Sequence, residues 1–284
     1  MTVATTTRRG TAWHRLRRNR LSFAGVLVLS GVVITVIVGP LLWRVDPIAI
    51  DLANRLAAPS ALHPLGTDIQ GRDLLARILH GGRVTLFVAV ASVVVALVFG
   101  SGAGLLSGFV RGWFDTAVMR VADVLLAFPP LLLALVIAAA RGPGVANTIL
   151  AVSIPALPRF ARLMRAQSLA IREREYVLAA WAVGLSPLRI LFRHVLPNAV
   201  GPVTVQASIA AGIAVLEVAG LGFLGLGVQP PSPELGAILV DSQTYLLQQP
   251  TAVLAPGIVI SLSILGFNLL GDALGDVFDV GSGS

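Results

Sequence analysis

The sequence of 284 residues contains neither cysteine nor lysine. Without cysteine, the chain cannot form disulfides or thiolate metal sites. Without lysine, it cannot contain a P-loop, because that motif needs a lysine on the β- and γ-phosphates of the nucleotide. The four histidines are scattered, and none has a neighbour at a spacing typical of metal ligands. We therefore expect no metal, no cofactor and no catalytic activity in this chain.

Charged residues are also scarce, at 12% of the chain against roughly 25% in an ordinary soluble domain. Apolar residues make up 56%, and the mean hydropathy is +0.86. So little polar surface cannot cover a soluble domain of this size, and many apolar side chains must face lipid. The net charge of +7 does not indicate a nucleic-acid partner, because the arginines cluster beside apolar runs rather than forming a basic stripe.

Six apolar segments have about the length that a helix needs to cross a bilayer, roughly 20 residues. They are residues 21–43, 84–110, 116–140, 144–159, 198–221 and 251–271. Prolines inside the fourth segment are tolerable, because neighbouring helices can satisfy the backbone groups that they free. The sequence thus predicts an all-α integral membrane protein with six transmembrane helices over residues 21–280. Residues 1–20 form an N-terminal segment, and 281–284 read as a linker outside the fold.

Arginine positions predict the orientation of these spans. Six spans place both termini on one side, and with the N-terminus inside, 15 of the 21 basic residues fall in inner segments and 6 in outer ones. Because basic residues favour the cytoplasmic side, both termini are expected to be cytoplasmic. Residues 44–83 are then an outer loop, and residues 159–197 are a cytoplasmic loop.

The cytoplasmic loop has the pattern of two short helices with a sharp turn between them. Gly184 can end the first helix in a left-handed conformation. Ser186 is a natural N-cap for the second helix, with Pro187 at its first position. We expect this second helix to end at Pro197, where the chain enters the membrane. The alternative is a helical hairpin that merely lies on the membrane face.

The first of these helices is rich in alanine, which favours helix formation. Its small side chains would allow close approach of a partner protein's cleft. Here the sequence resembles the membrane permeases of binding-protein-dependent ABC importers. Their loop has the pattern E-A-A, three residues, G, nine residues, I, one residue, L-P. The matching positions are Ala179, Ala180, Gly184, Leu196 and Pro197, whereas Leu178 replaces the glutamate and His194 the isoleucine. The variant Arg193-His194-x-Leu196-Pro197-Asn198 resembles the dipeptide, oligopeptide and nickel branch.

This resemblance implies that the loop is a coupling helix that fits into a cleft on a separate ATPase subunit. The implied coupling residues are Tyr176, Ala179, Ala180, Gly184, Ser186, Arg189, Arg193 and His194.

The outer loop carries a second pattern, made of Gly66, Thr67, Asp68, Gly71, Arg72 and Asp73. By itself it predicts an amphipathic helix on the outer surface, capped by Thr67 or Asp68 and supported by an Asp73–Arg77 pair. The same string resembles a signature of the second permease subunit, the DppC/OppC type. It could receive a substrate-binding protein or gate the outer mouth, or it could serve packing alone.

Two acids, Asp123 and Glu217, fall inside predicted spans, and an intramembrane acid is a functional candidate by default. For Asp123, a structural pair with Arg120 is the favoured interpretation. Polar residues of the spans are candidates for lining the pathway, although any of them could only bridge helices. These candidates are Ser92, Asn147, Ser153, Thr204, Gln206 and Ser208.

The resemblance implies a multi-pass permease of the bacterial inner membrane that imports solute with ATP energy. Its partners are a second homologous permease, ATP-binding subunits that hold ATP and Mg, an extracytoplasmic substrate-binding protein and membrane lipid. The substrate stays open among peptides of different lengths, nickel and haem-like ligands. The alternative is an ion-gradient-driven secondary transporter with Asp123 or Glu217 as proton carrier, but no inverted repeat is evident. An exporter half is disfavoured, because those usually carry their ATPase in the same chain.

Overall fold

A computed structural model describes residues 20–279, and the regular structure in this range is helical apart from one isolated bridge. The all-α expectation is thereby confirmed. The predicted N-terminal segment, except Arg20, and the 281–284 linker lie outside the described residues. The α-helices are α2 (Arg20–Leu42), α3 (Leu74–Val110), α4 (Gly112–Leu126), α5 (Pro130–Arg141), α6 (Val145–Arg172), α7 (Glu175–Ala182), α8 (Pro187–Ile190), α9 (Leu196–Phe223), α10 (Leu235–Ser242) and α11 (Thr251–Asp279). Short 3₁₀ turns occupy Leu52–Asn54 and Gln243–Tyr245, and a π turn occupies Leu191–Val195.

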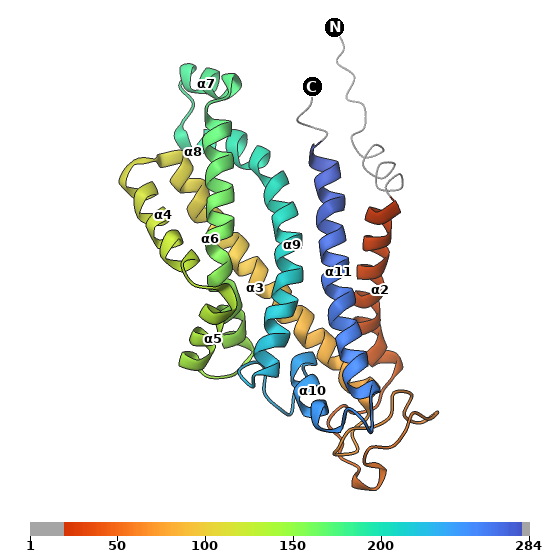
Figure 1. Cartoon of the computed structure of the whole chain (residues 1–284). Helices are drawn as coiled ribbons and strands as arrows, with labels where there is room; N and C mark the ends of the chain where they lie inside the picture. The colour runs from red at the N-terminus through yellow and green to blue at the C-terminus, as the bar shows by residue number, and fades with distance from the viewer. Residues whose placement is uncertain (1–19, 280–284) are drawn as a thin grey trace.

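The long helices form one bundle with two distinct ends (Figure 1). At one end, called here the α7 end, lie α7, α8, the start of α2 and the finish of α11. At the other, the α10 end, lie α10 and the loop of residues 43–73. The described ends of the chain therefore share one side of the bundle, as an even number of crossings requires.

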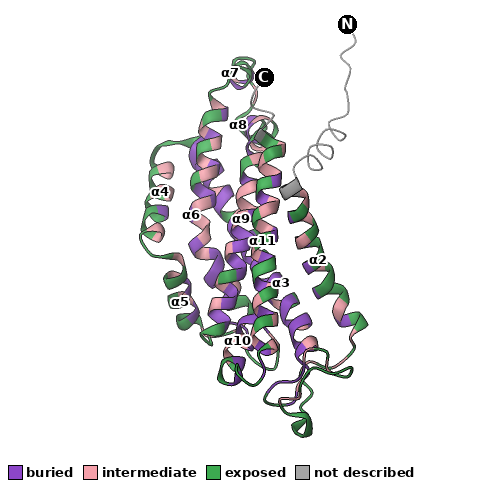
Figure 2. Ribbon diagram, turned by 45° about the vertical axis from the view of Figure 1, so that its right-hand side comes forward, coloured by how far each residue is buried: buried purple, intermediate pink, exposed green. Residues whose placement is uncertain are grey.

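The core of the bundle lies where α3 crosses α6 and α9, and the buried residues in Figure 2 concentrate along these helices. Gly100, Gly104 and Gly108 allow α3 and α6 to approach closely. A Cβ on Gly104 would lie 2.1 Å from the carbonyl oxygen of Ala161. In a membrane, no hydrophobic driving force brings helices together, because lipid tails are as apolar as the side chains. Stripes of small residues favour association instead by letting the helix backbones pack closely.

Four helical stretches are long and apolar enough to cross a membrane: 23–42, 74–110, 187–223 and 251–278. Helices α4 and α5 pass the same test together and make a fifth, but they meet at an angle of 91°. The predicted third span, 116–140, is thus broken rather than straight. Pro129 and Pro130 explain the break, because the residue before a proline is pushed out of helical conformation. The fourth predicted span, 144–159, is the first half of α6, whose second half adds basic residues. By length and apolarity alone, the described residues therefore contain four candidate spans, or five if the bent α4–α5 pair is counted as one, against the predicted six.

The predicted amphipathic helix of the outer loop is wrong as a separate element. Residues 74–83 are instead the first turns of the 37-residue α3, and Leu74, Ala76 and Ile78 are buried. The single apolar edge of this segment predicts a helix lying on the outer surface. In the structure, however, that apolar edge packs against other parts of the protein.

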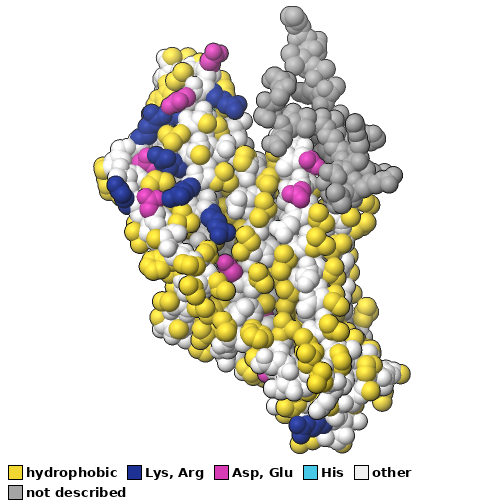
Figure 3. Space-filling view, viewed as in Figure 1, with side chains coloured by type: hydrophobic (Ala, Val, Ile, Leu, Met, Phe, Trp, Pro, Cys, Tyr) yellow, Lys and Arg dark blue, Asp and Glu magenta, His cyan; other side chains and the backbone are white. Residues whose placement is uncertain are grey.

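Outward-facing side chains along the spans are mostly large and apolar, including Leu42, Phe99 and Val136. The space-filling view agrees, with hydrophobic side chains spread over much of the molecule (Figure 3). Since no described partner covers these faces, they suit lipid or another membrane helix.

Candidate functional site

The turn between α7 and α8 has the two hydrogen bonds of a Schellman motif. The N–H of Leu185 donates to the carbonyl of Ala180 over 3.1 Å, and that of Gly184 donates to Trp181 over 3.0 Å. Gly184 has φ +78°, while a Cβ added there would meet nothing within 4 Å. Glycine is therefore favoured by backbone conformation rather than by space. The predicted helix–turn–helix is confirmed.

The second helix starts as predicted but does not end at Pro197. Ser186 is its N-cap residue and Pro187 follows, although the Ser186 side chain makes no capping hydrogen bond. The chain then passes through the π turn, in which the N–H of Leu196 bonds to the carbonyl of Leu191, and continues into α9. Because Pro197 lacks an N–H and crowds the carbonyl four residues earlier, one widened turn lets the helix continue.

Helix α7 is fixed to the ends of α3 and α6 by buried and aromatic contacts. Val177 and Ala180 are buried. The indole of Trp181 stacks on Phe109 of α3, with ring centroids 6.0 Å apart and an interplanar angle of 21°. The guanidinium of Arg172, at the end of α6, lies 5.6 Å from the centroid of the same Phe109 ring. These contacts connect α7 to two long helices, α3 and α6.

The opposite face of the loop is exposed and largely apolar. Val183 is 76% exposed and Leu188 is 67% exposed, and both lie at the α7 end of the bundle. We call this face the α7 surface: Tyr176, Leu178, Ala179, Ala182, Val183, Leu188 and Phe192, all of them exposed. Exposed apolar side chains gathered on one short segment outside the bundle core are typical of a protein interaction site.

The predicted coupling residues divide between this surface and its support. Arg189 and Arg193 are exposed beside the α7 surface, as are Tyr176 and Ala179 within it. Ala180 faces inward, so it supports the loop rather than touching a partner. His194 is half-buried, with its ring centroid 6.3 Å from that of Tyr176.

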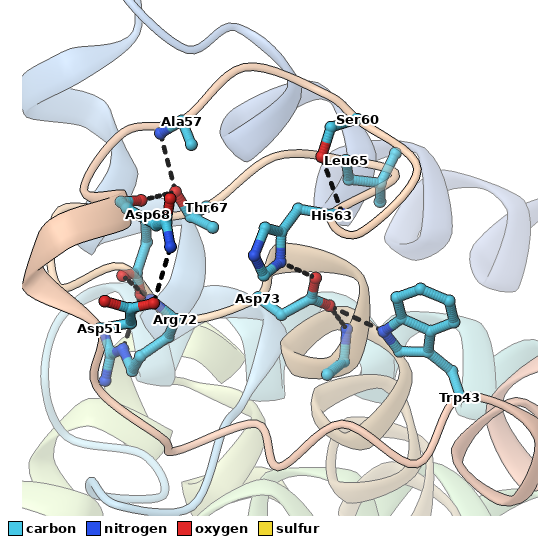
Figure 4. A network of polar contacts seen from close by, with 12 residues as sticks. Trp43, Asp51, Ala57, Ser60, His63, Leu65, Thr67, Asp68, Arg72 and Asp73 are labelled. Carbon is cyan, nitrogen blue, oxygen red and sulfur yellow. Dashed lines mark hydrogen bonds and ion pairs between the residues drawn. The ribbon is translucent and has the colours of Figure 1, made fainter.

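At the α10 end, the outer-loop pattern forms a buried polar network (Figure 4). The Asp68 carboxylate accepts from Arg72 Nε at 2.6 Å and from Arg77 Nη1 at 2.5 Å. Arg77 Nη2 also donates to Asp241, in the last turn of α10, at 3.3 Å. The side chains of Asp68 and Arg77 are 0% and 5% exposed, so this ion pair is buried, whereas the Asp241 side chain is 45% exposed.

Asp73 joins a different set of partners, and the predicted Asp73–Arg77 pair is wrong. Its carboxylate caps α3 by accepting from the N–H of Ala76 at 2.7 Å. It also accepts from Trp43 Nε1 at 3.0 Å and contacts His63 Nδ1 at 2.8 Å. In this way one carboxylate connects the end of α2, the loop and the start of α3 (Figure 4).

The remaining residues of the pattern shape the loop. Thr67, which is buried, accepts from the N–H of Ala57 at 2.8 Å. Gly66 and Gly71 have φ +81° and +75°, and a Cβ on Gly71 would lie 1.7 Å from the carbonyl oxygen of Asp51. Every residue of the pattern therefore has a structural task, and the packing alternative has physical support.

Glu234 is a residue that the sequence reasoning missed. It is fully buried and accepts from Thr85 Oγ1 at 2.8 Å and from the N–H groups of Gly236 and Ala237 at 3.0 and 2.9 Å. It thereby caps α10 and ties it to α3. Burial raises the pKa of the Glu234 carboxyl, while these hydrogen bonds act in the opposite direction. An acid just before an apolar helical stretch was the available signal.

Asp123 pairs with Arg162 of α6 at 2.5 Å, so the predicted partner, Arg120, is wrong. One turn nearer the α7 end of α6, Arg165 holds Asp115 through two bonds of 2.5 and 2.6 Å. Charged side chains gather over this part of α4 and α6 in Figure 3. The Asp123 and Arg162 side chains are 50% and 51% exposed. A charged pair within the membrane-spanning part of the bundle is costly against lipid. The face of α4 and α6 that carries Asp123 and Arg162 is therefore suited to contact with water or protein.

The six predicted pathway residues lie on α3, α6 and α9, and their role in lining a pathway stays a prediction. Ser92, Ser153 and Thr204 donate to carbonyls one turn earlier in their own helices. The other three are placed separately: Asn147 bonds to Arg141, Ser208 donates to the Phe267 carbonyl of α11, and Gln206 is half-buried on α9. Ser92 alone among the six lines a cavity together with Glu217.

Comparisons with known proteins agree along nearly the whole chain. Residues 100–281 match the family described as binding-protein-dependent transport system inner membrane component. Residues 7–59 match the N-terminal TM domain of oligopeptide transport permease C. The chain is 42% identical to the dipeptide transport system permease protein DppC of Alkalihalophilus pseudofirmus, over 94% of this chain and 88% of that protein. It is 39% identical to the glutathione transport system permease protein GsiD of Pectobacterium atrosepticum, over 94% and 89% of the two chains.

A third relative is the probable D,D-dipeptide transport system permease protein DdpC of Escherichia coli, 40% identical over 94% of this chain and 90% of that protein. The family match covers well over half of the chain and includes α7 and α8, the charged face of α4 and α6, and α9 to α11. This chain belongs to the family of inner membrane components of binding-protein-dependent transport systems.

Proposed function

We propose that this chain is the DppC/OppC-type permease subunit of an ATP-driven importer of peptides. Its relatives are named as permeases for dipeptides, glutathione and D,D-dipeptides, which share free amino and carboxylate groups. The chain lacks the P-loop lysine, so the ATP and Mg are held by separate subunits. The α7 end lies in the cytoplasm and the α10 end faces the substrate-binding protein.

The α7 surface carries this proposal. It presents a short apolar helix beyond the bundle, and the Trp181–Phe109 stack and buried Val177 join it to α3 and α6. When two ATPase subunits bind ATP and close, they displace α7. The long helices then move between two discrete packings, one open to each side of the membrane.

The pathway runs between this chain and a second homologous permease. The half-exposed Asp123–Arg162 pair supports this arrangement, because such charges are stable against water or protein but not against lipid tails. Hydrolysis of ATP then resets the inward-open packing after the solute has entered.

The test is retention of the ATPase subunits by the purified transporter. Val183→Asp and Leu188→Asp place a charge on the α7 surface, and each is expected to release the ATPase subunits. Leu62→Asp makes the same change at an exposed leucine in the loop of the α10 end and should retain them. Full retention in both α7-surface variants, with ATP-dependent dipeptide uptake unchanged, would refute the proposal.

A second measurement separates the proposal from a secondary transporter. In proteoliposomes holding the complete complex, ATP-dependent dipeptide uptake should persist when an ionophore collapses the proton gradient. Loss of uptake with ATP still present would favour the ion-driven alternative.

A further inference from the structure

A cavity of about 20 Å³ lies among α3, α5, α6 and α9, in the interior of the bundle. Three polar side chains line it: Ser92 from α3, Arg159 from α6 and Glu217 from α9. The rest of its lining is aliphatic, aromatic or proline. Its volume is that of roughly one water molecule. Four helices thus bring an acid and a base to one small polar space inside an apolar wall.

Both charged residues lie well within their helices. Glu217 is six residues before the end of α9 at Phe223, about 9 Å at the helical rise. Arg159 lies 14 residues after the start of α6 at Val145, about 21 Å. Ionisable groups at such depth are costly unless they have a partner or a task.

Glu217 and Arg159 differ from the charged residues that pair between α4 and α6. Asp123–Arg162 and Asp115–Arg165 are direct ion pairs of 2.5 Å. Within the described residues, by contrast, Glu217 feels the charge of Arg159 but forms no ion pair with it. The two groups are near enough to neutralise one another in part, and both retain hydrogen-bonding capacity.

The walls of this cavity contain the residues that break or bend helices. Pro130 begins α5 after the 91° bend, and Pro155 lies inside α6. Each proline removes a backbone N–H, and α6 therefore lacks one of its ladder bonds beside Arg159. Backbone rotation at these positions would widen the space between α5 and α6 while breaking fewer helical hydrogen bonds than rotation within a regular helix.

We propose that Glu217 binds the ammonium group of a peptide in transit, while Arg159 faces its carboxylate side. This inference rests on the proposed function, because it assumes that α5, α6 and α9 line this chain's side of the pathway between the two permeases and that the cavity opens into that pathway. A carboxylate and a guanidinium held apart complement a zwitterion, and charge-assisted hydrogen bonds replace the water that the peptide loses. Selectivity in this chain is thus for free peptide termini rather than for side chains.

The absence of cysteine allows a first test that needs no transported substrate. Glu217→Cys is labelled in the complete reconstituted transporter, with and without ATP, by small anionic and cationic methanethiosulfonates. We expect labelling from water and a faster reaction with the anionic reagent, because Arg159 remains. Adding Arg159→Gln should remove this preference. The control is Ile258→Cys, seven residues from the α10 end of α11 and exposed on the outside of the bundle, which should stay unlabelled.

The second test measures uptake of L-alanyl-L-alanine by the same transporter. Glu217→Gln should lower the uptake rate at least about tenfold, because a charge-assisted hydrogen bond is lost. Glu217→Asp should restore much of it, and the ATPase rate stimulated by the binding protein should not change. Asp272→Asn, an exposed carboxylate on α11 away from the cavity, should leave uptake unchanged.

The outcomes separate this inference from the proposed function. If Glu217→Cys is unreactive in every state, or Glu217→Gln transports the dipeptide like the wild type, the inference is wrong while the permease role stands. If the wild type shows no ATP-dependent uptake of dipeptide, the proposed peptide importer fails, and labelling at Glu217→Cys alone decides whether the cavity joins an aqueous path.

Discussion

In the proposed mechanism, movement of α7 reaches α3 through Trp181, so truncation of this side chain should uncouple ATP hydrolysis from transport. The indole stacks on Phe109 at a centroid distance of 6.0 Å, and Arg172 lies over the same ring. Trp181→Ala leaves the α7 surface, and hence ATPase docking, in place. The expected result is continued ATP hydrolysis with a reduced number of peptides imported per ATP.

The size of this effect follows from the aromatic contact. A stacked aromatic pair contributes about 0.5–1.5 kcal/mol beyond its buried area. Since 1.4 kcal/mol corresponds to a factor of ten, loss of this coupling energy should lower the transport-to-hydrolysis ratio roughly twofold to tenfold. Trp181→Phe keeps a stacked ring and should lose less than half of that free energy.

The assay compares dipeptide uptake with phosphate release in proteoliposomes containing the complete transporter. Trp113→Ala is the matched control, because Trp113 is 81% exposed on α4 and its ring pairs with Phe114 of the same helix. The reasoning is refuted if Trp181→Ala keeps the wild-type ratio of peptide to ATP. It is also refuted if Trp113→Ala lowers this ratio equally.

Three further predictions concern the scaffold. Gly104→Leu should lower thermal stability in detergent by about 1–3 kcal/mol or more, because its Cβ would lie 2.1 Å from the carbonyl oxygen of Ala161. Asp68→Ala leaves the buried guanidinium of Arg77 with only Asp241 and should cost about 3–5 kcal/mol by denaturant unfolding. The raised pKa of Glu234 means that its stabilising effect is complete below its ordinary pKa of 4.5 and is lost as pH rises through its folded-state pKa. Glu234→Gln should therefore flatten the decline of melting temperature between acidic and alkaline pH.

Each scaffold prediction has a control or an outcome that contradicts it. Gly102→Leu adds the same side chain on α3 where nothing lies within 4 Å of a Cβ, and it should be tolerated. Asp46→Ala removes an exposed carboxylate of the same loop and should change the unfolding free energy little. Equal losses in variant and control would contradict both packing arguments. A steeper pH dependence in Glu234→Gln would contradict the third.

Local sequence chemistry was sufficient for the α7–α8 turn. Gly184 needs a left-handed backbone, and Ser186 with Pro187 is a strong helix start, so three neighbouring residues determine the element. The broken third span could also have been predicted, because Pro129 and Pro130 stand at the bend. The continuation through Pro197 could not, since it depends on a π turn that local propensities do not specify.

Long-range pairing was beyond local reasoning. The spacing of four residues predicts an ion pair between Arg77 and Asp73. In the structure Arg77 instead pairs with Asp68 and with Asp241, which is 164 residues away in the sequence. Asp123 was likewise assigned to a neighbour on its own helix and pairs with Arg162 of α6. Sequence spacing identifies which residues could meet on one helix, but tertiary packing decides which of them do.

The most direct test of the central claim reconstitutes this chain and its second permease with and without the ATPase subunits. With the ATPase subunits, binding protein and ATP present, we predict uphill uptake of L-alanyl-L-alanine. Without the ATPase subunits, we predict no uphill uptake at any imposed proton gradient. Accumulation of dipeptide at the full rate by the two permeases alone would contradict the account.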